Sequence, residues 1–366
     1  GDCQNGYGVF ISEEGTYKGD WKDGRVHGKG IFEGNEYTYD GAYGNGKKHG
    51  QGKMTYTNGT IEEGLFENNK FVKAQGFNNA NIDATKAEDY YNKANDYEDK
   101  GEYQLAIDNY TKCLRIDPDY VTAYLFRGYS YSLIGNYNGA IADFTRAIRI
   151  DPDDAYSYYA RGNVYDDLEN YEDAIADYTR AIRADPDYAV AYVFRGNVYD
   201  DLELYEEALA DFTRAITIDP DDAYSYYSRG DVYYDLENYD DAIADYTRAI
   251  TTDPEYKYAY LSRGDVYDDL ELYEEALADF TKAVRIDPDY TVAYNNRGIV
   301  FGKKENYNEA IADFNRAIRI YPDYTNAYAN RGFAKKLAGL SYCSDYKKAC
   351  DLGEEWCCES YNEDCK

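Results

Sequence analysis

"AYSYYARGNVYDDLENYEDAIADYTRAIRADPDY" occupies residues 155–188, and its pattern decides the fold of most of the chain. Its second half places apolar side chains on one side of a helix, at Ala174, Ile175, Tyr178, Ala181 and Ile182. Gly162 and Ala174 are small, which predicts that two helices cross closely at these positions. Pro186 ends the second helix, because the residue before a proline disfavours helical geometry. The stretch therefore predicts two packed helices joined by a turn.

This unit recurs along the chain with a period of 34 residues. The period is marked by prolines at Pro118, Pro152, Pro186, Pro220, Pro254, Pro288 and Pro322. It is marked again by glycines at Gly128, Gly162, Gly196, Gly230, Gly264, Gly298 and Gly332. A second period of 68 residues is also present, because "LENYEDAIADY" alternates with "LELYEEALADF". Such regularity predicts an open stack in which each helix pair touches only its neighbours.

The unit resembles the tetratricopeptide repeat. Its motif positions are filled by Tyr158, Gly162, Tyr165, Ala174, Tyr178, Ala181 and Pro186. The resemblance implies seven repeats over residues 87–324, followed at 325–339 by the first helix of an eighth repeat. Residues 325–366 then form a capping helix and a cysteine-rich, helical segment. The implied fold class is mainly α, a right-handed α-solenoid.

One position departs from that family. Its usual leucine before the glycine is replaced by Arg127, Arg161, Arg195, Arg229, Arg263, Arg297 and Arg331. An aspartate recurs in the second helix at Asp143, Asp177, Asp211, Asp245, Asp279 and Asp313. We expect these residues to form a ladder of charge-assisted, bidentate pairs along the solenoid. A structural ladder is favoured over a ligand site.

The first 75 residues carry a different repeat, with a period of 22 residues. "YKGDWKDGRVHGKG" at 17–30 matches "YDGAYGNGKKHGQG" at 39–52. Alternating aromatic residues and glycines at turn positions predict short hairpins. The pattern resembles the MORN repeat, which implies a small β-sheet domain over residues 1–75 that acts in docking or assembly. Residues 76–86 are then a linker to the helical repeats.

The first helices of the repeats are expected to line an acidic and aromatic groove. Its residues are Tyr156, Tyr159, Asn163, Asp166, Asp167, Asp200, Asp201, Tyr224, Tyr227, Asp231, Asp235, Asp265, Asp268 and Asp269. The tetratricopeptide clamp for a peptide carboxylate needs Lys and Arg there, which this groove lacks. A basic peptide, a glycan stacked on tyrosines and divalent cations are the candidate ligands, and a solvated acidic face without a ligand is the alternative. "DPDD" at 151–154 and 219–222 lacks the spacing of a calcium loop.

The chain has seven cysteines. Cys113 replaces the small alanine of other repeats and is expected in the core. The remaining ones are Cys3 and the tail residues Cys343, Cys350, Cys357, Cys358 and Cys365. "ACDLGEEWCC" at 349–358 resembles disulfide-bridged Sel1-like repeats, which implies a Cys350–Cys358 bridge. Zinc is the rival interpretation, but the spacing and the lack of histidine make it a poor one.

Five tail cysteines cannot all pair among themselves. The unpaired tail cysteine is expected to be Cys357 or Cys365, because it should be the exposed one. Its one remaining candidate partner is Cys3. Seven stacked repeats span roughly 70 Å at about 10 Å for each layer, whereas a disulfide needs Cα atoms within about 7 Å. A bridge between these ends would therefore join neighbouring molecules. Repeated head to tail, it gives a filament.

Charge and motifs narrow the classes of function. The net charge of -31 disfavours nucleic acid and anionic membranes as partners. No apolar run is long enough to cross a membrane, and no catalytic or cofactor signature is present. The chain begins at Gly1 and its one methionine is Met54, which fits a removed signal peptide or a trimmed start. Asn58 and Asn109 lie in glycosylation sequons.

Two functions remain. The first is a secreted structural protein, without enzymatic activity or cofactor, that assembles with copies of itself into an extracellular filament. The second is a tetratricopeptide scaffold that binds a basic peptide or a glycan in its acidic groove.

Overall fold

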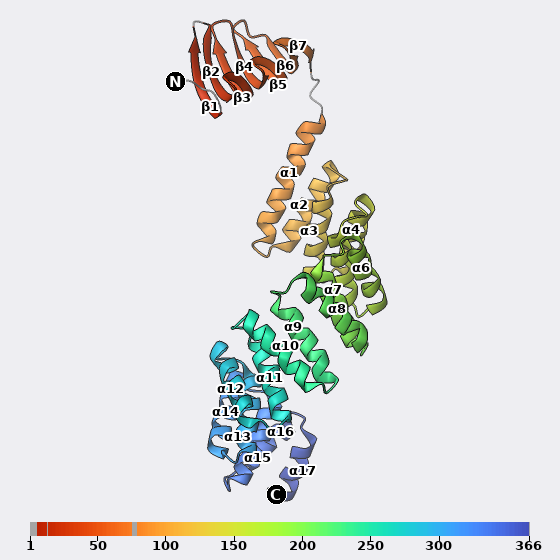
Figure 1. Ribbon diagram of the computed structural model, residues 1–366, viewed down its shortest axis with the longest axis vertical. Coiled ribbons are helices and arrows are strands. Elements are labelled where there is room, and N and C mark those ends of the chain that lie inside the picture. The colour runs from red at the N-terminus through yellow and green to blue at the C-terminus, as the bar shows by residue number, and fades with distance from the viewer. Residues whose placement is uncertain (1–5, 13, 75–78, 366) are drawn as a thin grey trace. The chain divides into compact units, whose positions relative to one another are not determined.

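The computed structural model describes residues 6–12, 14–74 and 79–365. The chain divides into two compact units, Gly1–Ala123 and Tyr124–Lys366. The first unit contains a β-sheet and the first helices, and the second contains the remaining helical repeats (Figure 1). The predicted fold class, a helical solenoid with a small β-sheet at the N-terminus, is confirmed.

The sheet is an antiparallel meander in which every strand pairs with the next one in the chain (Figure 1). Its strands are β1 (Gly6–Ser12), β2 (Gly15–Lys22), β3 (Arg25–Gly34), β4 (Tyr37–Gly44), β5 (Lys47–Tyr56), β6 (Ile61–Glu67) and β7 (Lys70–Ala74). Asp23 and Asn45 begin two-residue turns with φ of 51°, and each is followed by a glycine that also has positive φ. These turns match the twist of the strands that they join.

Large aromatic rings lie over glycines on one face of this sheet. A Cβ on Gly30 would come within 2.3 Å of the Tyr17 hydroxyl, and one on Gly52 within 2.2 Å of the Tyr39 hydroxyl. Glycine is therefore required at both positions. The rings of Tyr17 and Tyr39 pack with Phe66 into a small core, in which Tyr39 and Phe66 are fully buried.

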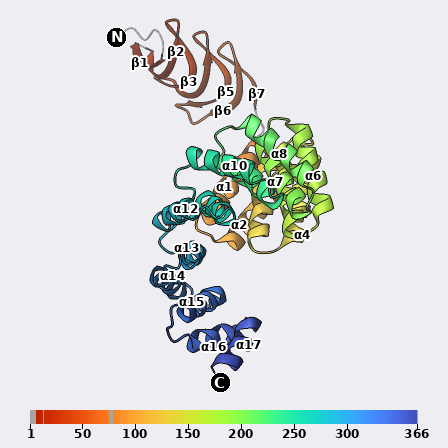
Figure 2. The same cartoon turned by 60° about the horizontal axis from the view of Figure 1, so that its bottom comes forward.

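The rest of the described chain is helical (Figure 2). The helices are α1 (Asn79–Glu98), α2 (Tyr103–Ile116), α3 (Val121–Leu133), α4 (Tyr137–Ile150), α5 (Ala155–Asp167), α6 (Tyr171–Ala184), α7 (Ala189–Asp201), α8 (Tyr205–Ile218), α9 (Ala223–Asp235), α10 (Tyr239–Thr252), α11 (Lys257–Asp269), α12 (Tyr273–Ile286), α13 (Thr291–Lys303), α14 (Tyr307–Ile320), α15 (Thr325–Leu337), α16 (Cys343–Asp351) and α17 (Glu355–Asp364). Their lengths repeat because the sequence repeats.

Each repeat in the second unit closes around one aromatic ring. The ring comes from the second helix and lies against the glycine of the first helix, as Tyr178 does against Gly162 and Phe212 against Gly196. The first helices of neighbouring repeats also touch one another from α5 to α15. We call the surface formed by α3, α5, α7, α9, α11, α13 and α15 the inner face.

The predicted cysteine-rich helical segment begins with the second helix of the last repeat, a correspondence that the sequence analysis did not identify. "SDYKKAC" at 344–350 in α16 corresponds to "ADYTRAI" at 176–182 in α6. Tyr346 lies over Gly332, as the equivalent ring does in the other repeats. The helix α17 packs on α16, and disulfides Cys343–Cys365 and Cys350–Cys358 join the two helices. This helical pair therefore closes the end of the solenoid.

The glycine–ring contact predicts a large difference between two Gly-to-Ala substitutions. Gly196→Ala lowers the free energy of unfolding by about 1–3 kcal/mol, because the new Cβ lies 2.9 Å from Phe212 Cε1. Gly302→Ala is the control, because a Cβ there meets nothing within 4 Å. It raises stability by up to about 1 kcal/mol through helix propensity. Denaturant unfolding of both variants measures the difference, and equal effects would contradict this packing.

Candidate functional site

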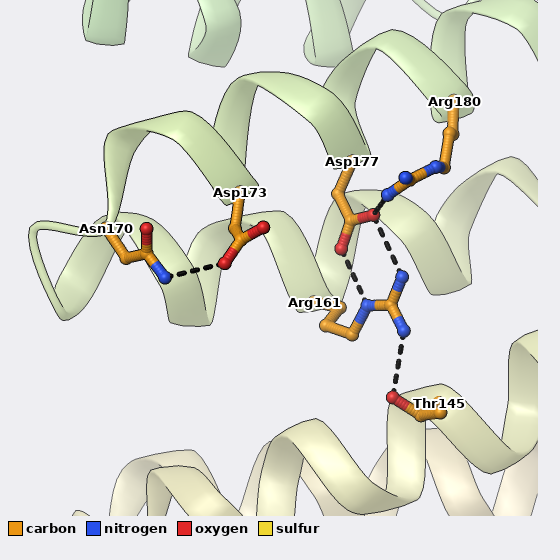
Figure 3. Close-up of polar contacts among 6 residues, drawn as sticks. All are labelled: Thr145, Arg161, Asn170, Asp173, Asp177 and Arg180. Carbon is orange, nitrogen blue, oxygen red and sulfur yellow. Dashed lines mark hydrogen bonds and ion pairs between the residues drawn. The ribbon is translucent and has the colours of Figure 1, made fainter.

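From α5 onward, an arginine in the first helix of each repeat joins three helices. Figure 3 shows that Arg161 in α5 binds Asp177 in α6 with Nε and Nη2, and reaches Thr145 in α4 of the preceding repeat with Nη1. Across six repeats the Nε–Oδ2 distances are 2.6 to 2.7 Å and the Nη2–Oδ1 distances 2.7 to 2.9 Å. The predicted Arg–Asp ladder is confirmed.

The bond to the preceding repeat was not predicted. Its Nη1–Oγ1 distance is 2.8 to 3.1 Å in five consecutive repeats. The signal was present, because a threonine follows two residues after the ladder aspartate in "ADYTRAI". The last repeat continues the ladder with Arg331, Asp345 and Asn315. The arginine thus fastens each repeat both internally and to its neighbour.

Burial makes these pairs strong constraints. Asp177 has no exposed surface and also accepts a hydrogen bond from Arg180 (Figure 3). The hydrogen bond to Asp245 raises the pKa of Arg229 above its ordinary value. A buried ion pair loses its stabilising effect when one partner is removed, because the other charge is left without compensation. The ladder aspartates therefore have a structural role.

The tyrosines predicted for the groove lie on the inner face and contact one another. The rings of Tyr156 and Tyr159 are 6.0 Å apart, and those of Tyr224 and Tyr227 are 6.3 Å apart. Tyr159 also meets Phe194 of the next first helix at 5.2 Å. These residues form a surface that combines apolar ring faces with the hydroxyl groups of the tyrosines.

Several predicted groove residues already have hydrogen-bond partners within the chain. Asn163 accepts a hydrogen bond from Tyr178, and Asp231 accepts one from Tyr246. Asp265 accepts one from the Asn296 side chain at 2.8 Å. Burial still raises the pKa of Asp265 to about 7, and the charges of Asp268 and Asp269 add to this effect.

Other aspartates face each other across neighbouring first helices without a cation. Burial, followed by the charges of Asp201 and Asp167, raises the pKa of Asp166 to about 6. Burial, followed by the charge of Asp235, raises the pKa of Asp200 to about 6. Within the described residues, no Lys or Arg forms an ion pair with these side chains. We call them the Asp166–Asp201 pair and the Asp200–Asp235 pair.

Farther along the inner face the same arrangement contains a lysine. Lys303 stands in the position of Asp269, Asp235 and Asp201, 34 residues after the first of them. Its Nζ lies 2.8 Å from both carboxylate oxygens of Asp268. The sequence analysis missed this residue, although the period places it in the groove. The inner face is therefore not free of basic residues, and one of its carboxylates is neutralised.

Cavities open between the first helices at both ends of the inner face. One of about 530 Å³ is lined by Tyr129, Tyr156, Tyr159, Asn163, Asp166, Asp167 and Phe194, among others. An equivalent cavity of about 400 Å³ lies five repeats later. There Phe333 and Leu337 replace Asn163 and Asp167. The face thus changes from acidic and aromatic to apolar along the solenoid.

The cysteines of the tail pair locally. Cys350 is joined to Cys358, the bridge implied by the Sel1-like resemblance, and Cys343 is joined to Cys365. Cys357 is left over, but the expectation that the remaining cysteine is exposed is wrong. Its side chain is fully buried, and burial raises the pKa of its thiol to about 11. Cys3 lies outside the described residues.

Two other predictions are affected by burial. Asn109 is 4% exposed, and its amide donates to the Leu105 carbonyl, so the folded helix withholds it from glycosylation. Asn58 is exposed in a turn.

The two "DPDD" segments begin helices. Their Asp154 and Asp222 accept hydrogen bonds from backbone amides at the starts of α5 and α9. They serve as helix caps.

None of the helices in the described part of the chain is both long and apolar enough to span a membrane. No group of three or more His, Cys, Asp or Glu side chains in that part of the chain is arranged to hold a metal ion.

Family models match most of this architecture. Tetratricopeptide repeat models match residues 159–223 and 227–291, and 87–120 and 291–324. A TPR repeat model matches residues 128–169, and a MORN repeat model matches residues 17–36 and 39–61. The tetratricopeptide segments together cover more than half of the chain. The chain therefore belongs to the tetratricopeptide repeat family, with MORN repeats in its first part.

Two solved structures with TM-scores above 0.5 show the same fold, and a third is similar in sequence over half of the chain. A tetratricopeptide repeat protein from Parabacteroides merdae is 20% identical with a TM-score of 0.53, over 68% of this chain and 99% of that one. The Cut9–Hcn1 assembly of the APC/C is 16% identical with a TM-score of 0.53, over 75% of this chain and 55% of that one. YrrB, a TPR protein with an unusual peptide-binding site, is 30% identical with a TM-score of 0.43, over 51% of this chain and 96% of that one. No curated protein sequence matches the chain.

The ladder predicts a strong effect of removing one arginine. Arg195→Ala leaves the carboxylate of Asp211, which is 6% exposed, without its partner. We expect the free energy of unfolding to fall by about 3–5 kcal/mol. Thr179→Ala removes only the bond to the preceding repeat and costs about 1 kcal/mol.

Arg214→Ala is the matched control, because its pair with Asp187 is exposed on both sides. It changes stability by less than about 1 kcal/mol. Urea unfolding followed by circular dichroism measures all three variants. A loss below about 1 kcal/mol for Arg195→Ala would contradict the structural role of the ladder.

The raised pKa of Asp200 predicts a pH-dependent stability. Its pKa is 3.8 when unperturbed and about 6 in the fold, so the ionised form destabilises the folded state above that pH. Asp200→Asn therefore stabilises the protein at pH 8, by about 1 kcal/mol after allowance for solvent screening. The gain disappears as the pH falls through about 6 toward 4, where the carboxylate is protonated. Melting temperatures at pH 8 and pH 4.5 test this, and a gain that is equal at both pH values would refute it.

Proposed function

We propose that the protein is an interaction scaffold whose inner face binds a basic segment of a partner polypeptide. The observation that carries this proposal is the row of aspartates whose pKa values are raised to about 6 or 7 and whose charges the described chain leaves largely uncompensated. A protein surface that keeps carboxylates close together gains most from a cationic ligand, because the ligand removes their mutual repulsion.

The chemistry of the face favours a polypeptide over a glycan. Tyrosine rings alone suit either ligand, since sugars and side chains both stack on them. The carboxylates distinguish the two, because an uncharged glycan leaves their repulsion in place. The pair of Lys303 with Asp268 supplies an internal example of a lysine on this face. The apolar cavity near Phe333 and Leu337 adds a place for an apolar side chain of the same segment.

The disulfides support an oxidising compartment. Cys343–Cys365 and Cys350–Cys358 hold the two short helices that close the solenoid. Such bridges persist in secreted proteins and are rare in reducing compartments. We therefore propose that the scaffold is secreted, where glycosylation at the exposed Asn58 is compatible with the fold.

Self-assembly is the second candidate, with a different contact from the one expected. A disulfide from Cys3 of one molecule to Cys357 of another would require α17 to open, because Cys357 is buried. The edge strand β1 offers another route. Its Tyr7, Val9 and Ile11 are 52% to 75% exposed, and an exposed apolar edge strand is able to pair with a second chain. A filament built in this way would be held together by strand pairing and not by disulfide bonds between molecules.

Binding of a basic peptide tests the main proposal. Isothermal calorimetry with octalysine and octaglutamate should show binding of octalysine alone, and the affinity should fall as salt rises. Replacing Asp166, Asp167, Asp200 and Asp201 with Asn should weaken binding by at least tenfold. The control replaces Glu172, Glu206, Glu207 and Glu275, which are exposed on second helices, with Gln for the same change of charge.

Equal losses in both variants would mean that only net charge matters, and no binding would refute the proposal. Sedimentation of the oxidised protein at rising concentration tests self-assembly in the same samples. Oligomers that Ile11→Lys abolishes support pairing at β1, and oligomers that only reductant abolishes support a disulfide.

A further inference from the structure

The aspartate pairs of the inner face occupy one repeated position. In four consecutive repeats a residue near the end of one first helix approaches a residue 35 positions later, on the next first helix. The four combinations are Asp166 with Asp201, Asp200 with Asp235, Tyr234 with Asp269, and Asp268 with Lys303. The sequence thus places four different pairs of side chains in the same backbone setting.

In the last two combinations, another side chain of the protein donates a hydrogen bond to the aspartate. Tyr234 donates its hydroxyl to Asp269 at 2.8 Å. Lys303 places its ammonium 2.8 Å from both oxygens of Asp268 and 6.0 Å from the centre of the Tyr273 ring. That ammonium therefore has a carboxylate on one side and an aromatic ring on the other, which is a favourable setting for a cation.

The first two combinations have the same surroundings but no cation among the described side chains. Tyr171 and Tyr205 occupy the position of Tyr273, 102 and 68 residues earlier. Burial and then the charge of Asp201 raise the pKa of Tyr171, and burial and then the charge of Asp235 raise that of Tyr205. The aromatic wall that accompanies Lys303 is therefore repeated beside both pairs.

An unpartnered oxygen marks one of these pairs. Oδ1 of Asp200 is buried and has no hydrogen-bond partner among the described residues. A buried acceptor without a partner costs about 1–3 kcal/mol, so it is rarely left in a fold without a reason. A donor that reached this oxygen after a rotation of the Asp200 side chain would satisfy it.

The cavity next to the Asp166–Asp201 pair suits the rest of a lysine side chain. Asp166 lies on its wall together with Tyr159 and Phe194, whose rings are 5.2 Å apart. Aromatic faces accept the methylene stem of lysine while its charged end stays beside a carboxylate. The volume of about 530 Å³ is ample for one such side chain.

We propose that the Asp166–Asp201 and Asp200–Asp235 pairs each receive the ammonium group of a lysine from the bound polypeptide, in the way that Asp268 receives Lys303. This inference rests on the proposed function and specifies its ligand. The two pairs lie one repeat apart, and adjacent packed helices are about 8–10 Å apart. An extended chain covers that distance in about three residues. The recognised segment therefore has the spacing Lys-x-x-Lys.

Substitutions that copy Lys303 test the inference directly. Asp201→Lys and Asp235→Lys put a lysine of the chain itself into each pair, so both should raise the melting temperature at pH 8. The same variants should lower the affinity for a Lys-x-x-Lys peptide by about tenfold for each pair in calorimetry. A peptide with both lysines acetylated should not bind. Glu206→Lys is the control for charge alone, because Glu206 is exposed on a second helix, and it should change the affinity less than twofold.

The outcomes separate the two proposals. If basic peptides bind and neither Lys variant weakens them more than Glu206→Lys does, the lysine sites are wrong and the scaffold proposal stands. If no basic peptide binds but both Lys variants raise the melting temperature, the pairs accept ammonium groups and the proposed partner is wrong. If the melting temperatures also stay unchanged, both are wrong. Spermidine binding more tightly than the peptide would assign the sites to a polyamine and overturn the polypeptide ligand.

Discussion

A largely buried guanidinium group needs hydrogen-bond partners within the protein, and this requirement organises the repeats of the second unit. In the second unit the ladder arginine finds a carboxylate in its own repeat and a hydroxyl or amide oxygen in the preceding one. Two helices and their predecessor are thereby held at fixed distances. The glycine beside the arginine and the ring over that glycine follow from the same close approach.

Aspartates therefore play two opposite roles in this protein. Those of the second helices, such as Asp177, are buried and paired with arginine. Those of the inner face, such as Asp166 and Asp200, are partly exposed and repel one another. The ladder supplies the rigidity that keeps the second group together despite the repulsion. Sites where a fold maintains an unfavourable local arrangement are where function is expected.

Much of this organisation was predictable, because regular repeats make the contacts regular. The helix pairs, a close helix crossing at Gly162 and the Arg–Asp ladder followed from spacing alone, although the residue that lies over Gly162 is Tyr178 and not the predicted Ala174. Apart from the recurring bond to the threonine, the features that were missed are departures from the period. Lys303 is one changed residue in an otherwise acidic position, and "SDYKKAC" begins two residues early relative to the preceding repeats. The choice of Cys357 as the unpaired tail cysteine depends on helix orientation in α17, which no spacing rule supplies.

The hydrogen bond from the ladder arginine to the threonine of the preceding repeat has a consequence for the evolution of the chain. From Arg161 to Arg297 each arginine bonds a threonine of the preceding repeat, so these five junctions have the same chemical requirements. Recombination that removes or inserts a whole number of repeats rebuilds an intact junction at the new boundary. An exchange of any other length places an arginine opposite residues other than its aspartate and threonine partners. Related chains should thus differ in length by whole repeats.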